Sequence, residues 1–495
     1  MVPIHLGTES EFAVVRRFLQ EAEFSELNIR SRVKCESLLD LIHLPEVEGS
    51  ADVITMLIRL FLQHGSFALQ ETEAYIPEQV LAVFLSLGLL SLDDTGRIYS
   101  PTLLTPTESV FCASDRYRMV DGKASLIEDA VYPSSSPPTQ TFVRFLPRGK
   151  CRRLLEIGSG SGVCAMLAAR GYSEQVWASD ITSRSTEFAE FNRQLNAIPN
   201  MTVVQGDMYA AVEGMTFDRI IAHPPYVPVL KKKWVFYDGG EDGESISRRV
   251  IEGLAQHLEP GGRCYCKTLG SDREVPFEQR VRQWLGPSEN EFDVLVAQWD
   301  EKPVPQFFAE LSLAGDNAEQ DFKNWLEFAT RVKMRTFLNC MIAVQRRESD
   351  RPVFTVRRYF SPKSDPASIE WLMTWQTAAM LQDPATTILG SRPRTSQGVQ
   401  LSFKRRHVAD DWVPVEFRIE TEYPFANDGV LEQWMPALFS YCTGEVTTAD
   451  IFARLKAEQL VAEGTSDAAF ANMIAAFVAR GFLEIESFSL PGARG

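Results

Sequence analysis

Two short segments hold the residues of this sequence that are best suited to chemistry. One is His223-Pro224-Pro225-Tyr226, and the other is the glycine-rich segment 156–162 upstream of it. The two prolines restrict the backbone, so that the carbonyl groups of the leading residues can point into a site. Tyr226 adds an aromatic face for a planar group. Such a rigid set of acceptors is suited to orienting a nitrogen nucleophile and removing part of its hydration.

The glycine-rich segment predicts a cofactor site. Glycines are needed where the backbone takes positive φ or approaches a ligand closely. Dinucleotide-binding enzymes use Gly-x-Gly-x-x-Gly at this place, so glycines alone are a weak signal. Here the glycines alternate, at 158, 160 and 162, and Glu156 precedes them by two positions. Both features fit S-adenosylmethionine, whose sulfonium and amino groups are cationic, better than an anionic pyrophosphate.

Three acidic residues end three consecutive predicted strands. Glu156 ends the first, Asp180 ends the second and Asp207 ends the third. A carboxylate at Asp180 can accept both ribose hydroxyls, and one at Asp207 can accept from the adenine amino group. The sequence therefore predicts S-adenosylmethionine as cofactor, with S-adenosylhomocysteine as product. The predicted cofactor-binding residues are Glu156, Gly158, Ser159, Gly160, Gly162, Asp180, Ile181, Asp207, Met208 and His223.

Alternating strand and helix patterns surround these residues. Such alternation requires a mostly parallel sheet that helices cover on both faces. The last two strands are too far apart for a hairpin turn, and the segment at about 300–335 between them has a helical pattern. Long insertions of this kind often form lids or substrate walls. The predicted strands are 153–157, 175–179, 202–205, 217–222, 262–269, 292–298 and 336–345.

The segments on either side of this region have different patterns of predicted secondary structure. Residues 1–120 are mainly helical, with Thr8 and Glu11 forming a capping box and a hairpin at 88–99, which predicts a winged-helix-like domain with a packing role. The Pro/Ser segment 132–138 is expected to be a linker that excludes helix. Residues 349–495 read as an α+β domain. Its strands are expected near 354–359 and 415–421, and its two last helices, at 447–460 and 467–480, lead into a second winged-helix-like unit.

Composition bears on which partners, metals and cell compartments are expected for this chain. The 495 residues carry a formal net charge of −16, which argues against a broad surface for nucleic acid and makes a nucleic-acid substrate less favoured. The eight cysteines are scattered without the spacing of a metal site, so no metal is predicted. No secretory signal or membrane-spanning run is apparent, which predicts a cytoplasmic protein. The oligomeric state cannot be read from the sequence.

The motifs together resemble a known family. Glu156–Gly162, Asp180, Asp207 and Pro224-Pro225-Tyr226 are similar to those of class I methyltransferases of the "methyltransferase small" type, and most of all to release-factor glutamine methyltransferases. Further matching positions are Asn192, 237–243 and 258–262. The resemblance implies a Rossmann-like, seven-stranded α/β domain over 121–348. It also implies S-adenosylmethionine as methyl donor and an amide or amino nitrogen of a peptide, a protein or a small metabolite as acceptor.

His223 departs from that family, which has Asn or Asp at this position. Neutral imidazole accepts through only one nitrogen, but it titrates near neutral pH and can act as a general base. His223 could therefore orient the acceptor together with Pro224, Pro225 and Tyr226, or deprotonate it, which would allow O-methylation. Methylation of a nucleobase amino group is a further alternative. A function of a different class, that of a non-catalytic sensor or scaffold that only binds the cofactor, is also an alternative.

Overall fold

The computed structural model describes residues 2–35, 38, 47, 52–116, 127–231, 234–313, 317–381, 384–486 and 488. The chain separates into two compact units, Met1–Leu269 and Gly270–Gly495. The domain boundary predicted at 120/121 lies outside the described residues. No helix in the described ranges is long and apolar enough to cross a membrane.

The first unit begins with a helical region. Thr8 caps its first helix, and the reciprocal bonds of the capping box with Glu11 are both present, as predicted. The predicted hairpin also forms, with β2 and β3 antiparallel and β1 added on the other side of β3. The elements are α1 Glu9–Glu21, α2 Glu26–Val33, α3 Val53–Phe61, β1 Ser66–Ala68, α4 Leu69–Glu73, α5 Glu78–Ser86, β2 Ser91–Leu92 and β3 Arg97–Tyr99. The winged-helix identity of this region stays a prediction.

A buried hairpin, β4 Thr102–Thr107 and β5 Val110–Asp115, follows. Fully buried Asn192, on α8 Ser183–Leu195, accepts from the backbone N–H of Ala113 at 2.8 Å and donates to its carbonyl at 2.9 Å. Its amide also donates to the Ser161 carbonyl at 2.9 Å. Asn192, which the family resemblance singled out, thus joins β5 to the glycine-rich segment.

The Pro/Ser segment is not the linker that the sequence predicted. The helix α6 Pro137–Phe145 starts at its two last prolines, because proline is tolerated in the first turn, where the N–H has no intrahelical partner. Ser134 is fully buried, and its hydroxyl lies 2.9 Å from that of Thr105 and 3.0 Å from that of Thr107. The prediction failed because these prolines were read as helix breakers although they begin the helix.

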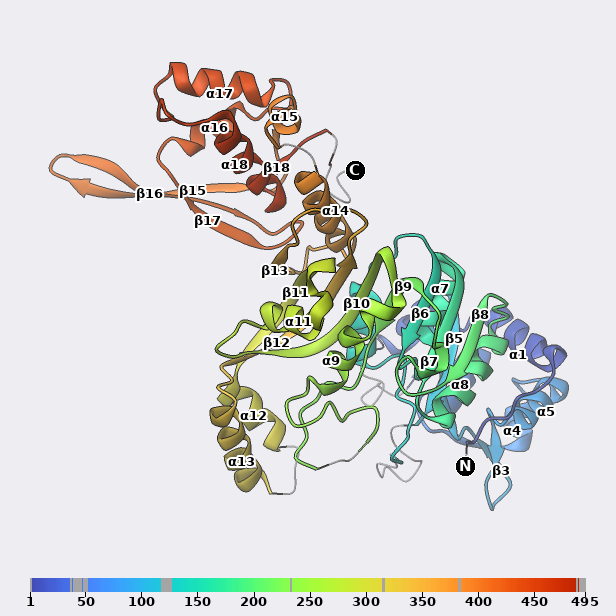
Figure 1. Cartoon of the computed structure of the whole chain (residues 1–495). Helices are drawn as coiled ribbons and strands as arrows, with labels where there is room; N and C mark the ends of the chain where they lie inside the picture. The colour runs from blue at the N-terminus through green and yellow to red at the C-terminus, as the bar shows by residue number, and fades with distance from the viewer. Residues whose placement is uncertain are drawn as a thin grey trace. The chain divides into compact units, whose positions relative to one another are not determined.

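The main sheet has the strand order β13-β11-β12-β10-β9-β6-β7-β8, and helices lie against it (Figure 1). Strands β10, β9, β6, β7 and β8 run parallel, whereas β12 is antiparallel to β11. All seven predicted strands are present. They are β6 Cys151–Ile157, β7 Ser173–Asp180, β8 Met201–Gln205, β9 Phe217–Ala222, β10 Leu258–Asp272, β11 Phe292–Pro303 and β12 Thr336–Arg346. Besides α8, the helices between β6 and β11 are α7 Val163–Gly171, α9 Ser245–Glu252, α10 Leu254–His257 and α11 Phe277–Trp284.

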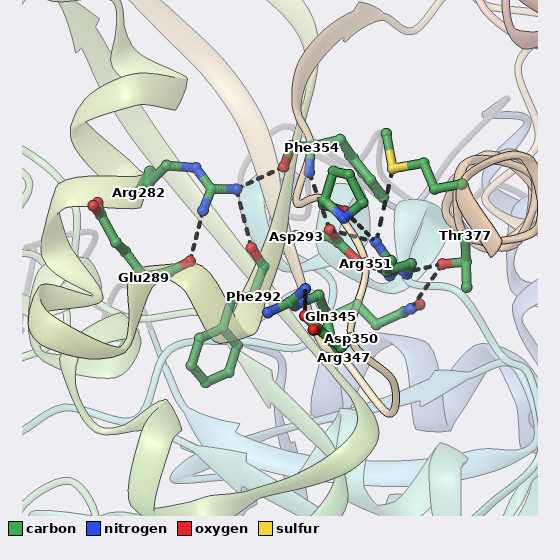
Figure 2. A network of polar contacts seen from close by, with 12 residues as sticks. Arg282, Glu289, Phe292, Asp293, Gln345, Arg347, Asp350, Arg351, Phe354 and Thr377 are labelled. Atoms are coloured by element: carbon green, nitrogen blue, oxygen red, sulfur yellow. Dashed lines mark hydrogen bonds and ion pairs between the residues drawn. The ribbon is translucent and has the colours of Figure 1, made fainter.

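The sheet has eight strands instead of the predicted seven. The additional strand, β13 Thr355–Tyr359, pairs in parallel with β11. A buried ion pair between Asp293 of β11 and Arg351 fixes the chain that leads into β13, as Figure 2 shows. Asp293 also accepts from the backbone N–H of Phe354 at 3.1 Å, and Arg351 donates to the Thr377 hydroxyl at 3.0 Å. The sequence pattern identified the strand but not these long-range contacts.

The rest of the second unit contains the predicted helical insertion and a smaller α+β region. The insertion forms α12 Val304–Leu313 and α13 Ala318–Arg331, which border a hollow of about 390 Å³. Its role as a lid stays a prediction. The α+β region has α14 Ala367–Leu381, α15 Pro384–Leu389, α16 Met435–Tyr441, α17 Thr448–Ala457 and α18 Asp467–Ala479, the paired short strands β14 Arg394–Thr395 and β18 Leu483–Glu484, and a sheet of β15 Gln400–Val408, β16 Asp411–Thr421 and β17 Asn427–Leu431.

Candidate active site

The two segments singled out in the sequence meet at one edge of the parallel sheet. Strand β6 lies between β7 and β9, with Ile157 opposite Ser179 on one side and opposite Ala222 on the other. The residues that follow these strand ends are therefore neighbours. A Cβ at Gly158 would stand 4.0 Å from the carbonyl oxygen of His223. Open α/β sheets bind ligands at this edge, beyond the carboxyl ends of the strands.

The glycines in the loop have two different roles. Gly158, Gly160 and Gly162 all have positive φ, at 72°, 52° and 78°. A Cβ at Gly160 would meet no atom of the described structure within 4 Å, so the loop is open there. A Cβ at Gly162 would instead stand 3.2 Å from that of Ala189. Gly160 is thus placed for close approach of a ligand, whereas Gly162, the N-cap of α7, lies too close to Ala189 of α8 for a side chain to fit easily.

The acids at the first two strand ends are buried. Glu156 accepts from the backbone N–H of Ala165 at 2.7 Å, and Asp180 accepts from those of Gly160 at 2.9 Å and Thr182 at 3.1 Å. Burial raises the pKa of Glu156 to about 8, with a further contribution from the charge of Asp180. Burial also raises the pKa of Asp180. Neither carboxylate pairs with a cationic side chain within the described part of the chain.

These surroundings fit a cationic, hydroxyl-bearing ligand such as S-adenosylmethionine. A cation beside Glu156 would offset the cost of burying that carboxylate. Asp180 can still accept from a hydroxyl donor, because its Oδ2 accepts one hydrogen bond within the described structure, from Gly160, and a carboxylate oxygen can accept two. The buried hydroxyl of Ser159, in the loop itself, has no hydrogen-bond partner among the described residues. An unpaired buried hydroxyl at this place is suited to a ligand contact.

The third acid lies in a more exposed setting. Asp207 follows β8, and half of its side-chain surface is accessible, yet it pairs with Arg249 at 2.7 Å. Sequence reasoning did not foresee this partner. Met208 has a φ of 55°, a conformation that non-glycine residues seldom adopt. Ile181, after Asp180, exposes 53% of its surface. Both are apolar side chains next to a predicted cofactor acid, as expected for contacts with a flat ring.

His223 lies among aromatic rings and near a positive charge. Its ring centroid is 5.2 Å from that of Phe142 and 5.6 Å from that of Tyr226. No hydrogen bond reaches the imidazole from any residue that the structure describes. Burial, and secondly the charge of Lys267, hold the pKa of His223 well below its usual range. The imidazole is therefore neutral at physiological pH and can accept a hydrogen bond through one nitrogen.

Lys267 is the main site residue that sequence reasoning missed. It is buried in β10, donates to the Tyr226 hydroxyl at 2.6 Å and lies 4.1 Å from the centroid of that ring. Burial raises the pKa of Tyr226, so its hydroxyl stays protonated. The signal in the sequence was a single lysine within the otherwise uncharged run Cys264–Leu269.

The glycines after Pro-Pro-Tyr hold this segment in place. A Cβ at Gly239 would stand 2.7 Å from the backbone of Tyr226, and one at Gly243 would stand 2.5 Å from the Tyr226 carbonyl. Both contacts are too close for any side chain. Gly239 also donates its N–H to the Val227 carbonyl at 2.9 Å. Segment 237–243 is therefore a clamp on the backbone of the predicted catalytic segment.

Aromatic side chains continue from this clamp. The Tyr132 and Phe236 rings stack at 4.9 Å, Trp234 and Phe236 stack at 5.9 Å, and Tyr237 meets Trp234 edge to face at 5.9 Å. The site thus joins the glycine-rich loop, His223 and Tyr226 to an aromatic wall.

Comparison with known proteins agrees with this arrangement. The family model described as methyltransferase small domain matches residues 135–289. The predicted resemblance is confirmed. A release factor glutamine methyltransferase of Moorella thermoacetica is 32% identical over 150 residues, which cover 28% of this chain and 52% of that protein. A ribosomal protein uL3 glutamine methyltransferase of Bradyrhizobium diazoefficiens is 30% identical over 157 residues, covering 29% and 49%.

These matches show that the central region contains a methyltransferase small domain and resembles the release-factor glutamine methyltransferases. The chain spans about half the length of these two relatives. The individual site residues stay predictions.

Proposed function

We propose that the chain transfers a methyl group from S-adenosylmethionine to an amide or amino nitrogen of a peptide or protein. The observation that carries this proposal is the contact between the two motifs, where the His223 carbonyl faces Gly158 across neighbouring strand ends. A donor held by the glycine-rich loop would then lie beside an acceptor held by His223-Pro224-Pro225-Tyr226. The two relatives are a release factor glutamine methyltransferase and a ribosomal protein uL3 glutamine methyltransferase, which supports a protein acceptor.

The side chains divide the work of binding and orientation. Glu156, Ser159 and Asp180 would hold the cofactor, which supplies an electrophilic methyl group when it is bound. The carbonyls of the leading residues and the neutral His223 ring would accept from the acceptor's N–H groups and aim its nitrogen lone pair. Tyr226 would stack on the planar amide; its hydroxyl is held by Lys267 and its backbone by the glycine clamp. Orientation of this kind contributes to rate by removing the entropy cost of alignment.

The charge state of His223 favours an orienting role over that of a general base. A base works best when its pKa lies near the working pH. The pKa of His223 is well below that range, because of its burial and because of the Lys267 charge. O-methylation with His223 as base is the second candidate. The neutral imidazole supports it, because one of its ring nitrogens can accept a proton, which the Asn expected from the family resemblance could not do.

A labelling experiment tests the proposal. The chain is incubated with isotope-labelled S-adenosylmethionine and a cell extract, and the labelled peptides are sequenced by mass spectrometry. N-methyl amides survive mild base, whereas methyl esters of carboxylic acids are hydrolysed. Label on side-chain nitrogen is the expected result. Base-labile label would favour O-methylation. Cofactor binding without any methyl transfer would favour a sensor or scaffold.

Variants separate orientation from proton transfer. His223→Asn should keep at least a substantial part of the activity with an unchanged pH profile, because asparagine also accepts a hydrogen bond. If His223 is a base, the ascending limb of the profile should disappear in this variant. Lys267→Met should raise the pKa of His223, because it removes a nearby positive charge, and the imidazole resonances in an NMR titration would report it. His5→Asn, at an exposed histidine, is the control.

A further inference from the structure

The outer edge of β15, called here the β15 edge, is a surface that the site described above does not use. All nine residues of Gln400–Val408 are exposed. In the described structure β15 pairs with β16 alone, so β15 ends its sheet. In Figure 1 the hairpin of β15 and β16 extends beyond the helices α16–α18 of its own unit. An uncovered edge presents a row of unpaired N–H and C=O groups, which an extended segment can pair with as a further strand.

The two faces of this strand differ in character. Register places Leu401 and Phe403 opposite Ile419 and Phe417, on one face. Leu401 is 44% exposed and Phe403 is 59% exposed, which is high for apolar side chains in a sheet. Lys404 and Arg406 are on the other face, because side chains alternate along a strand. A segment that added to this edge would therefore meet Leu401 and Phe403, with Arg405 beside Phe403, on one face, and Lys404 and Arg406 on the other.

The positive charge is only partly neutralised within the chain. Lys404 pairs with Glu416 at 3.0 Å. Arg405 lies 5.3 Å from the ring centroid of Phe403, and neither Arg405 nor Arg406 forms an ion pair with a carboxylate of the described residues. This cluster stands out in a chain whose net charge is −16. Charge complementarity of this kind determines which partner is favoured at an edge.

The same charges disfavour a second copy of the chain as occupant. An antiparallel pairing of two β15 strands near their centres would bring the run Lys404–His407 of each copy against the other. Like charges placed opposite each other in a sheet are destabilising. We propose that the β15 edge binds an extended, acidic segment of another protein, with acidic residues at alternate positions and apolar residues between them. The proposal does not depend on methyl transfer.

Peptide binding to the full chain tests this. The probe is a nine-residue peptide of alternating Glu and Val, titrated by calorimetry. The same peptide with Lys for Glu tests charge, and one with N-methylated valines tests backbone pairing. Binding of the acidic peptide, with affinity reduced about tenfold or more for each altered peptide, is the expected result. Equal binding of the lysine peptide, or no binding of the acidic one, would overturn the proposal.

Protein variants locate the binding. Arg406→Glu should weaken the acidic peptide by about tenfold or more, whereas the same charge change at exposed Arg17 of α1 should leave it unchanged. Hydrogen exchange should show new protection at amides of 400–408 when the peptide is bound. Equal weakening by both variants would mean a non-specific charge effect. A dimer in sedimentation that Arg406→Glu abolishes, or tight binding of a single-stranded RNA at this strand, would also contradict the proposal.

Discussion

Buried carboxylates occur in two regions of this molecule, and their surroundings differ. Asp293 is fully buried and is bound by Arg351 and by the backbone N–H of Phe354. Glu156 and Asp180 are almost as buried, yet their donors are backbone N–H groups and, for Asp180, the Thr182 hydroxyl at 3.5 Å, and no cationic side chain of the described structure pairs with them. The fold neutralises the first carboxylate with its own residues. At the glycine-rich loop no cationic side chain of the described structure does so, and the pKa values of Glu156 and Asp180 are raised by their burial.

This difference separates a structural site from a ligand site on physical grounds. A buried charge without a counter-charge costs folding free energy, and its pKa rises as a result. Such a cost is retained where a ligand later offsets it, which is why perturbed pKa values gather at functional sites. The raised pKa values of Glu156 and Asp180 follow this pattern. For the Asp293–Arg351 pair, the same reasoning predicts a contribution to folding and none to cofactor binding.

The largest expected effect is on the structural pair. Arg351→Met should lower the free energy of unfolding by about 3–5 kcal/mol, because it leaves the Asp293 carboxylate buried without a counter-charge. Urea denaturation followed by tryptophan fluorescence measures it. The double variant Arg351→Met with Asp293→Leu should recover most of the loss, since both charges are then gone. If Arg351→Met were as stable as the unaltered chain, the Asp293–Arg351 pair would not have the structural role given to it here.

The next effect concerns Asp180. Asp180→Asn should weaken S-adenosylhomocysteine binding by roughly tenfold to a hundredfold with little loss of stability, because it removes a desolvated charge but keeps one acceptor oxygen. Calorimetry measures the affinity. Asp218→Asn is the matched control, because Asp218 also accepts two backbone N–H groups, from Arg152 at 2.8 Å and Arg153 at 2.7 Å, but lies at the amino-terminal part of β9. Equal weakening by both would show that Asp180 has no special role.

Glu156 should make stability depend on pH. Its pKa is about 8 in the folded chain, against an ordinary 4.5. Between these values the folded state holds a proton that the unfolded state has lost, so stability falls as pH rises through this window, by about 1.4 kcal/mol per pH unit. Urea unfolding at several pH values measures the slope. Glu156→Gln should flatten it, and an equal slope in both chains would assign the dependence to other groups.

The sequence predicted the strands of the sheet better than the residues that hold the site in place. All seven predicted strands formed, because a parallel sheet needs continuous apolar runs and the runs here are short and well separated. The strand ends placed Glu156, Asp180 and His223 close together. Lys267 contacts Tyr226, and Asn192 contacts β5, in each case across a long stretch of sequence. The spacing of apolar residues along the chain cannot predict such long-range pairs. Pro137 was misread because proline both ends and begins helices.

The smallest expected effect is at Asp207. Its pair with Arg249 is about half exposed, so Asp207→Ala should change the free energy of unfolding by less than about 1 kcal/mol. It should weaken S-adenosylhomocysteine by about tenfold at most, the loss of one solvated hydrogen bond. Arg249→Ala, which frees the carboxylate for the adenine amino group, should keep the affinity or raise it. Calorimetry on both variants decides this. If Asp207→Ala weakened binding as much as Asp180→Asn, burial would not be what distinguishes the acids that bind the cofactor.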